Sequence, residues 1–172
     1  MAANQLIRNT LRVGAIAAMS FAAGAMMGEP SAAQSALATV KKLDGAWRGS
    51  GTVTPTKGGK ERISCRVNYA VRVADFTQRI NCSGTDYRVN VNGNMNVRGN
   101  NITGNWTETV RNYSGNASGT VSGNKINVRI SGINFTGRMN ITVSGNRQTV
   151  NITRYDVNTK KFKNLANITL RR

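Results

Sequence analysis

Residues Arg88 to Arg98 read R-V-N-V-N-G-N-M-N-V-R and alternate strictly between two kinds of side chain. The odd positions carry Val, Gly or Met, and the even positions carry Asn or Arg. A period of two residues is typical of a β-strand with one face buried and the other in water. The segment therefore predicts a half-buried strand.

The same alternation recurs along the chain and predicts ten strands with no helix between them. Apolar residues at helical spacing are not found after the N-terminal leader. The predicted strands are Trp47–Val53, Ile63–Val71, Phe76–Cys82, Tyr87–Val97, Ile102–Val110, Gly115–Val121, Ile126–Ile130, Phe135–Val143, Gln148–Ile152 and Ala166–Leu170.

Four residues separate each apolar set from the next, from the second strand to the ninth. Several of these loops are rich in Gly and Asn, which tolerate the positive φ of tight turns. A four-residue loop makes its flanking residues cross-strand partners, so all apolar residues point to one side. We therefore predict an all-β fold, an antiparallel up-and-down meander of about ten strands that closes into a barrel. The loops are 72–75, 83–86, 98–101, 111–114, 122–125, 131–134 and 144–147.

The chain has two cysteines, Cys65 and Cys82. If loop 72–75 closes a hairpin, Val71 faces Phe76 and the two cysteines face each other on the inner side. Opposed residues have Cβ atoms about 4.5–5.5 Å apart, near the reach of a disulfide. We predict a Cys65–Cys82 disulfide, with two buried free thiols as the alternative.

Residues 1–36 read as a secretory signal peptide and a short leader. Arg8 and Arg12 precede the apolar stretch Val13–Met27, and Ser31-Ala32-Ala33 offers small residues for cleavage. An uncleaved membrane anchor is the alternative, but the stretch is shorter than the roughly 20 residues of a span. We predict a single barrel domain over 37–172, in the periplasm or secreted, where disulfides persist.

The chain carries 24 Lys and Arg against 7 Asp and Glu. Removing the leader, with Arg8, Arg12 and Glu29, leaves 22 basic and 6 acidic residues. Such a charge favours anionic partners through long-range attraction. For an exported protein we expect envelope lipid head groups, acidic glycans or an anionic ligand, and no nucleic acid. The alternative is that the charge only maintains solubility.

Catalytic residue patterns are missing from the sequence, which has no histidine. Ser–His and Cys–His nucleophile pairs, histidine acid–base catalysis and most metal sites are therefore ruled out. Among the acidic residues only Glu108 points inward within a strand, so no facing carboxylate pair is expected for glycoside hydrolysis. We expect no enzyme activity, no metal and no cofactor.

Trp106 is predicted to lie inside the barrel, between Gly93 on one neighbouring strand and Gly119 on the other. A large aromatic side chain over glycines fills the space that missing side chains leave. The alternative is that Trp106 forms a wall of a ligand cavity. Glu108 also points inward, and a buried carboxylate must be paired or protonated, unless it orients a ligand. Its expected partners are Arg154, Arg172, Tyr69 and Tyr113.

Two connections, Thr54–Arg62 and Thr153–Leu165, are longer and basic. Alternate connections of an up-and-down barrel lie at opposite ends, so these two share an end with loops 83–86, 111–114 and 131–134. We predict that this end is an open mouth with a basic rim. The alternative is that both connections are ordinary mobile loops.

Gly45-Ala46-Trp47, a G-x-W motif before a meander of short strands, resembles the calycin group of lipocalins, fatty-acid-binding proteins and avidins. The resemblance implies that Trp47 closes one end of the barrel and packs under an Arg near the last strand, here Arg171 or Arg172. Ten strands match the fatty-acid-binding branch, but Thr54–Arg62 is too short for that branch's helical lid. The chain also resembles small exported proteins of α-proteobacteria.

We interpret the chain as a monomeric barrel that binds a small apolar or amphipathic ligand in its lumen, with an anionic head group as one option. Glycines with inward parity would make room for it: Gly49, Gly93, Gly104, Gly119 and Gly137. The residues expected to contact the ligand are Trp106, Glu108, Val91, Met95, Met139 and Ile141.

The alternative function is a basic cell-envelope interaction protein that binds anionic lipid head groups or acidic glycans through its outer face. A third reading is an outer-membrane barrel with apolar residues facing lipid, but the sequence has neither aromatic girdles nor long loops on one side. The outward arginines are Arg48, Arg66, Arg79, Arg88, Arg98, Arg129 and Arg138.

Overall fold

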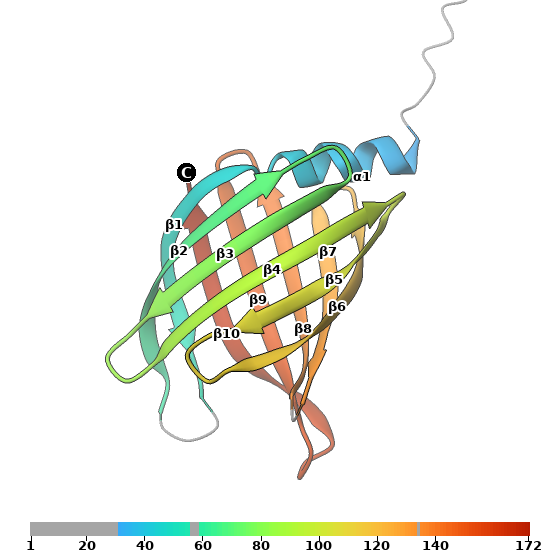
Figure 1. Cartoon of the computed structure of the whole chain (residues 1–172). Coiled ribbons are helices and arrows are strands. Elements are labelled where there is room, and N and C mark those ends of the chain that lie inside the picture. Colours follow the sequence, from blue (N-terminus) through green and yellow to red (C-terminus); the bar gives the residue numbers. More distant parts are fainter. Residues whose placement is uncertain (1–30, 56–58, 134) are drawn as a thin grey trace, which may run out of the picture.

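The computed structural model describes residues 31–55, 59–133 and 135–172. Ten antiparallel strands form a closed barrel in which each strand pairs with its neighbours in sequence, and β1 pairs with β10 (Figure 1). The predicted all-β up-and-down barrel is confirmed. The strands are β1 (Gly45–Val53), β2 (Glu61–Val71), β3 (Asp75–Ser83), β4 (Arg88–Arg98), β5 (Asn101–Glu108), β6 (Tyr113–Ser122), β7 (Lys125–Gly132), β8 (Phe135–Ser144), β9 (Arg147–Asp156) and β10 (Lys161–Arg171).

The two faces of the barrel wall differ as the alternation requires. In β2, Ile63, Cys65, Val67 and Tyr69 are buried and the residues between them are exposed. Each fully buried apolar side chain contributes about 1.5–3 kcal/mol to stability, so the lumen is the core of the fold. Because the apolar residues lie inside and Arg, Asn and Thr lie outside, the reading as a barrel with apolar residues facing lipid is wrong.

The register of the hairpins divides into two groups. The predicted pairings across loops 72–75, 98–101, 122–125 and 144–147 are confirmed. The pairings across the other three loops are shifted by two, four and two residues. Even shifts keep every side chain on its predicted face, which is why hydrophobicity alone could not detect them. The observed pairs are Cys82 with Val89, Trp106 with Gly115 and Ile130 with Gly137.

A disulfide joins Cys65 and Cys82, which face each other in neighbouring strands β2 and β3. The Cα atoms are 4.1 Å apart, and both side chains are buried. The predicted disulfide is confirmed, and the alternative of two free thiols is wrong.

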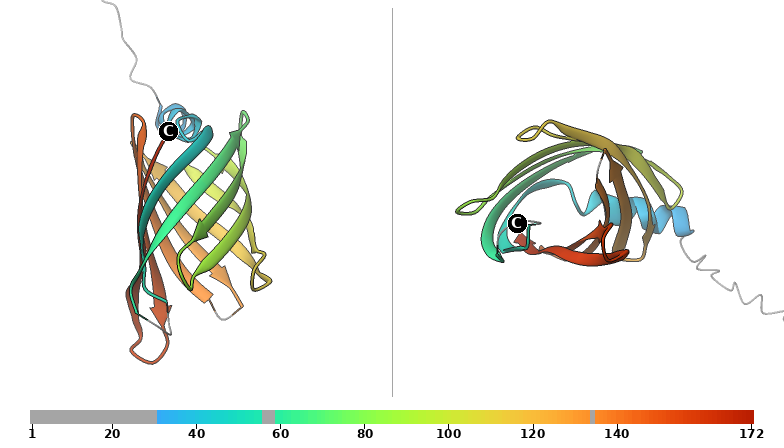
Figure 2. Two further views of the ribbon diagram at one scale, coloured as in Figure 1. Left: turned by 90° about the vertical axis from the view of Figure 1, so that its left-hand side faces the viewer. Right: turned by 90° about the horizontal axis from the view of Figure 1, so that it is seen from below.

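A helix, α1 (Ala32–Lys41), crosses one end of the barrel (Figures 1 and 2). The expectation of no helical pattern after the leader is therefore wrong, because α1 extends past residue 36. Ser31 caps it by accepting a hydrogen bond from the Gln34 N–H, and the Gln34 side chain accepts one from the Ser31 N–H. Ala36 and Val40 turn inward and are buried. Residues 1–30 of the predicted signal peptide lie outside the described residues.

The predicted long loop Thr153–Leu165 is instead a hairpin. Strands β9 and β10 continue to Asp156 and Lys161, and a β-bulge lies between Asn164 and Ala166. Asp156 accepts a hydrogen bond from Lys163 Nζ at 2.7 Å and backbone hydrogen bonds from the turn. These donors lower the pKa of Asp156. The two-residue alternation could not be recognised in this extension. Most of its side chains are polar, and the bulge switches the side chains of β10 from one face to the other.

None of the helices within the described ranges is long and apolar enough to cross a membrane.

Candidate binding site at the open end of the barrel

The α1 end of the barrel is sealed by Trp47, whose side chain is fully buried. Its indole Nε1 donates a hydrogen bond to the Leu43 carbonyl at 2.6 Å. The Arg172 guanidinium lies 5.0 Å from the centre of the Trp47 ring and donates a hydrogen bond to the Asp44 carbonyl at 2.8 Å. This is the arrangement that the G-x-W resemblance implies for the barrel end and for Arg172.

The lumen next to this seal is almost filled by side chains. A cavity of about 20 Å³, counted as space open to the centre of a water molecule, lies beside Leu43 and Tyr69. That is room for about one water, whereas small-molecule pockets measure about 300–1,000 Å³. Three predicted ligand residues, Met95, Met139 and Ile141, line this cavity.

Gln148 and Tyr69 form a hydrogen-bonded pair in the lumen, while Oε1 of Gln148 is buried without a hydrogen-bond partner among the described residues. Gln148 is fully buried, and its Nε2 donates a hydrogen bond to the Tyr69 hydroxyl at 3.2 Å. Burial raises the pKa of Tyr69 to about 12, against the opposing effect of the hydrogen bond from Gln148. Tyr69 is therefore neutral at neutral pH. It pairs with Gln148 and not with Glu108, which was one of its expected partners.

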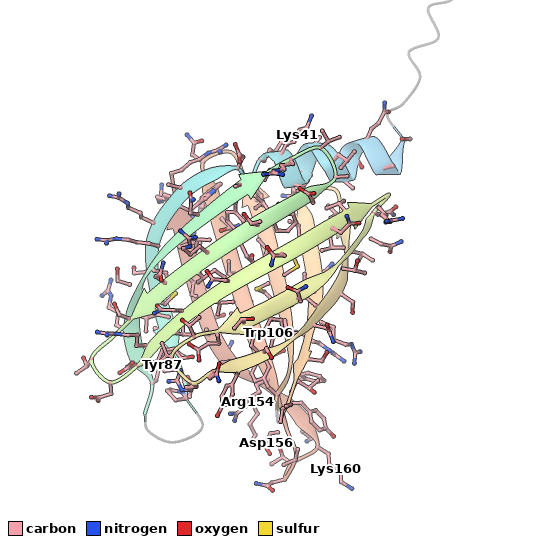
Figure 3. The ribbon with its side chains drawn as sticks, in the orientation of Figure 1. Lys41, Tyr87, Trp106, Arg154, Asp156 and Lys160 are labelled. Carbon is pink, nitrogen blue, oxygen red and sulfur yellow. A yellow bond between two sulfur atoms is a disulfide. The ribbon has the colours of Figure 1, made fainter. Side chains whose placement is uncertain are left out.

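At the end opposite α1, several inward-facing side chains are half-buried, while Val53, Ile63 and Cys82 at the same end are buried. Tyr87, Trp106 and Arg154 lie near this lower end in Figure 3, far from Lys41 beside α1. The described parts of the loops that were predicted to share one rim lie at this end (Figure 1). The half-buried inward residues at or near this end include Tyr87, Val89, Val91, Phe135, Ile152 and Arg154.

Trp106 is buried in the wall of the open half. It faces Gly93, as predicted, but on the other side it faces Gly115 and not Gly119. Its Nε1 donates a hydrogen bond to the Asn116 carbonyl at 3.2 Å. The ring also makes an edge-to-face contact with Phe135, with centroids 6.1 Å apart. The side chain thus fills the space over the glycines, and a role in contacting a ligand stays a prediction.

Glu108 is buried at the turn between β5 and β6, 5% exposed. Its carboxylate accepts backbone hydrogen bonds from Asn90, Val110 and Arg111 at 2.9–3.2 Å. The Arg111 guanidinium lies 3.8 Å from the carboxylate. Burial acts to raise the pKa of Glu108, but these donors outweigh it and the pKa is lowered.

The ion pair that Glu108 forms with Arg111 was not predicted from the sequence. Arg172 lies over Trp47 at the other end of the barrel, and Tyr113 is exposed. Arg111 was assigned to a loop, and nothing in its local sequence marks it as a partner. The main role of the Glu108 carboxylate is therefore to stabilise the β5–β6 turn, and not to orient a ligand.

Tyr87 and Arg111 form a polar group at the open end that the sequence analysis missed. The Arg111 guanidinium lies 5.3 Å from the centre of the Tyr87 ring, and its Nη1 donates a hydrogen bond to the Arg88 carbonyl. Burial raises the pKa of Tyr87, while the positive charge of Arg111 and, more weakly, that of Arg154 act to lower it. The shifted register at loop 83–86 concealed this group, because it moved Tyr87 from a strand into the turn.

The inward glycines do not enlarge the lumen, contrary to expectation. A Cβ placed on Gly119 would lie 2.0 Å from the carbonyl oxygen of Asn127 on the next strand. A Cβ on Gly93 would lie 2.8 Å from Nε2 of Gln78. At these positions glycine lets a neighbouring backbone or side chain come close. The space that a glycine side chain leaves empty is therefore already occupied.

The rim of the open end mixes charges and apolar groups. Lys160, Lys161 and Arg111 supply positive charge there, but Glu61 and Asp86 also lie on it. Most of the large apolar side chains that are exposed in the described ranges lie at this end; they are Val110, Tyr113, Ile133, Tyr155 and Val157.

Comparisons with known proteins agree with the barrel. No family model and no curated protein matches the sequence. The fold is similar to the crystal structure of Rv2717c from M. tuberculosis, with a TM-score of 0.65 and 14% identity over 80% of this chain and 96% of that chain. It is also similar to the S-type phycobiliprotein lyase CPES from Guillardia theta, with a TM-score of 0.56 and 8% identity over 77% of this chain and 89% of that chain. At these identities the likeness shows the barrel fold alone.

Proposed function

We propose that the protein is an exported barrel that binds a small apolar or amphipathic ligand, which enters through the end opposite α1. The observation that carries this proposal is the difference in closure. Inward side chains are apolar along the barrel. At the open end, the wall around Val91, Phe135 and Ile152 is only half-buried, although Val53 and Ile63 are buried there, whereas Trp47 and α1 bury the other end. Half-buried apolar side chains around a concave opening are typical of ligand sites.

The ligand would enter past Val91 and Trp106 and reach Met139. A cavity of about 20 Å³ cannot hold it unless side chains move. Met95 and Met139 border the cavity, and methionine has three flexible bonds that let it repack at low cost. We therefore expect a slender ligand, such as a single alkyl chain, whose binding displaces these side chains.

An anionic head group would lie near Tyr87 and Arg111. The guanidinium of Arg111 and that of Arg154 both act on Tyr87, so positive charge converges on the opening. Glu108 already takes hydrogen bonds from three backbone groups, and it partly offsets this charge. A carboxylate or phosphate head would gain from this cluster without entering the lumen.

We further propose a location outside the cytoplasm and a binding role without catalysis. The disulfide and the leader of the sequence support export. The lack of histidine and the engagement of Glu108 by backbone groups support a binder. The lyase activity in the name of the Guillardia neighbour is not carried over, since 8% identity relates the folds alone.

Native mass spectrometry of the protein purified from its own cells tests this proposal. We expect a bound molecule of one defined mass, released on unfolding. Luminal binding should persist between about 50 mM and about 500 mM NaCl, because buried apolar contacts are not screened. Empty spectra in repeated preparations, or a ligand lost as salt rises, would overturn luminal binding.

A further inference from the structure

Four arginines stand side by side on the outer wall of the barrel. In the register of the closed sheet, Arg66 on β2 faces Arg48 on β1, Arg48 faces Arg171 on β10, and Arg171 faces Arg147 on β9. All four are exposed. With neighbouring strands about 4.8 Å apart, this arginine ladder spans about 14 Å across the wall. The left view of Figure 2 shows β10, β1 and β2 next to each other.

The arginine ladder has no acidic counterpart. The ion pairs of Arg111 with Glu108 and of Lys163 with Asp156 do not involve the ladder. The outward positions of β9, β10, β1 and β2 carry no Asp or Glu. Like charges directly opposite each other destabilise a sheet. The ladder therefore works against the fold in the unliganded protein.

A row of hydroxyl groups lies beside the arginine ladder, one step nearer the open end. Thr149 faces Thr169, Thr169 faces Ser50, and Ser50 faces Ser64, on the same four strands. Guanidinium groups bind carboxylates and phosphates through paired hydrogen bonds, and hydroxyl groups can add further ones. Each strand thus presents one cation and one hydroxyl to the same face.

We propose that the arginine ladder binds a linear acidic glycan lying across β2, β1, β10 and β9. A chain with one carboxylate on every sugar can place successive anions over successive arginines. Sugar hydroxyl groups can meet the row of Ser and Thr. This site lies outside the lumen and does not depend on the proposed ligand entry.

Two other polyanions fit this face less well. Membrane-surface binding commonly buries exposed apolar or aromatic side chains in the interface, and single-stranded nucleic acid stacks on aromatic rings. The outward neighbours of the ladder are Ser, Thr, Asn and Ala. Most of the exposed aromatic and large apolar residues in the described ranges lie instead at the open end.

Titration of the full-length protein with a polyuronate decamer tests the proposal. The ladder variant carries Arg48→Gln, Arg66→Gln, Arg147→Gln and Arg171→Gln. The matched control carries Arg72→Gln, Arg79→Gln, Arg88→Gln and Arg98→Gln, which remove the same charge from exposed positions that face no arginine. We expect the ladder variant to bind at least about tenfold more weakly than the control.

Three results would overturn the proposal. The first is an equal loss in both variants, which would mean that net charge alone attracts the glycan. The second is tighter binding of a neutral glycan of equal length. The third is binding of phosphatidylglycerol vesicles or duplex DNA, but not of the polyuronate, through the ladder.

Thermal unfolding without ligand gives a second readout that does not require binding. Because three opposed pairs repel each other, the ladder variant should melt a few °C above the control in about 20 mM salt, on the order of 3 °C. Screening should remove the difference in about 500 mM salt. A ladder variant that melts below the control at low salt would show that the arginines stabilise the sheet, and would contradict the proposal.

Discussion

The two ends of this barrel are built from the same alternating strands but differ in closure. At the α1 end, Trp47 is 0% exposed, and Leu43 and Val40 pack beside it. At the open end, Tyr87, Phe135 and other inward residues are half-buried. The difference comes from the short helix α1 and from one bulky residue of β1, Trp47. Alternation therefore decides which residues face the lumen, while the helix and the size of that one side chain decide which end a ligand can reach.

The turns differ between the two ends as well. At the α1 end, Gly99 and Gly123 begin two-residue turns with φ of 58° and 55°. Such turns fix the register of the strands that they join. At the open end the β3–β4 and β5–β6 connections have four residues each, and all three predicted registers are shifted there. The tight end is thus specified by local sequence, and the open end by packing.

The largest expected difference between the ends concerns the two tryptophans. We expect Trp47→Ala to lower the free energy of unfolding by about 3–5 kcal/mol, because it leaves a cavity in the sealed end. Trp106→Ala should cost less, because the open end can relax and admit solvent. Urea denaturation measures both values, and an equal or larger loss for Trp106→Ala would contradict the contrast in closure.

The disulfide stabilises a half of the barrel that α1 does not cover. Cys65 and Cys82 are 17 residues apart in sequence. Replacing both with Ser should lower the free energy of unfolding by about 3 kcal/mol on the chain-entropy model. Denaturation of the double variant, with the reduced wild type as control, measures this loss. A loss close to zero would mean that the rest of the barrel already restrains this hairpin.

Glu108→Gln tests the role of the carboxylate in the β5–β6 turn. We expect a loss of about 1–3 kcal/mol at neutral pH, since hydrogen bonds to a charged acceptor are replaced by weaker ones. The pKa of Glu108 is lowered in the folded protein, so its stabilising effect is present above the ordinary value of 4.5 and is lost as the pH falls further. The difference between wild type and variant should therefore shrink in acid. A difference that stays constant down to low pH would contradict this role.

Thr39→Val addresses the contact of α1 with the barrel and has the smallest expected effect. The Thr39 hydroxyl donates a hydrogen bond to the Gly123 carbonyl at 2.6 Å. Its loss should cost about 0.5–1.5 kcal/mol in urea denaturation, with Thr103→Val on the exposed wall as a near-neutral control. If the two variants have the same stability, this contact does not hold α1 in place.

The sequence predicts the barrel and the disulfide because both depend on parity, which even register shifts preserve. It missed α1, although two signals were present. Ser31 and Gln34 have capping-box spacing, and Ala36, Val40 and Leu43 recur at helical spacing. The assignment of this segment to the leader concealed both signals.

The candidate site could be predicted less completely than the fold. The residues lining the lumen follow from parity, but their close packing depends on volumes that the pattern does not contain. The partner of Glu108 depends on the shape of a turn. The arginine ladder depends on β1 pairing with β10, a closure between distant parts of the chain that no hairpin rule supplies.

The most direct test of the central claim is a titration with a fluorescent long-chain carboxylate. Val91→Trp narrows the opening from inside, and Asn92→Trp adds the same ring to the outer face of the same strand. Ile152→Trp serves as a second blocking variant if the first does not fold. We predict saturable binding of one probe per chain, unchanged in Asn92→Trp and at least about tenfold weaker in the blocking variant. Equal affinity in all variants, or no saturable binding to the wild type, would contradict entry through the end opposite α1.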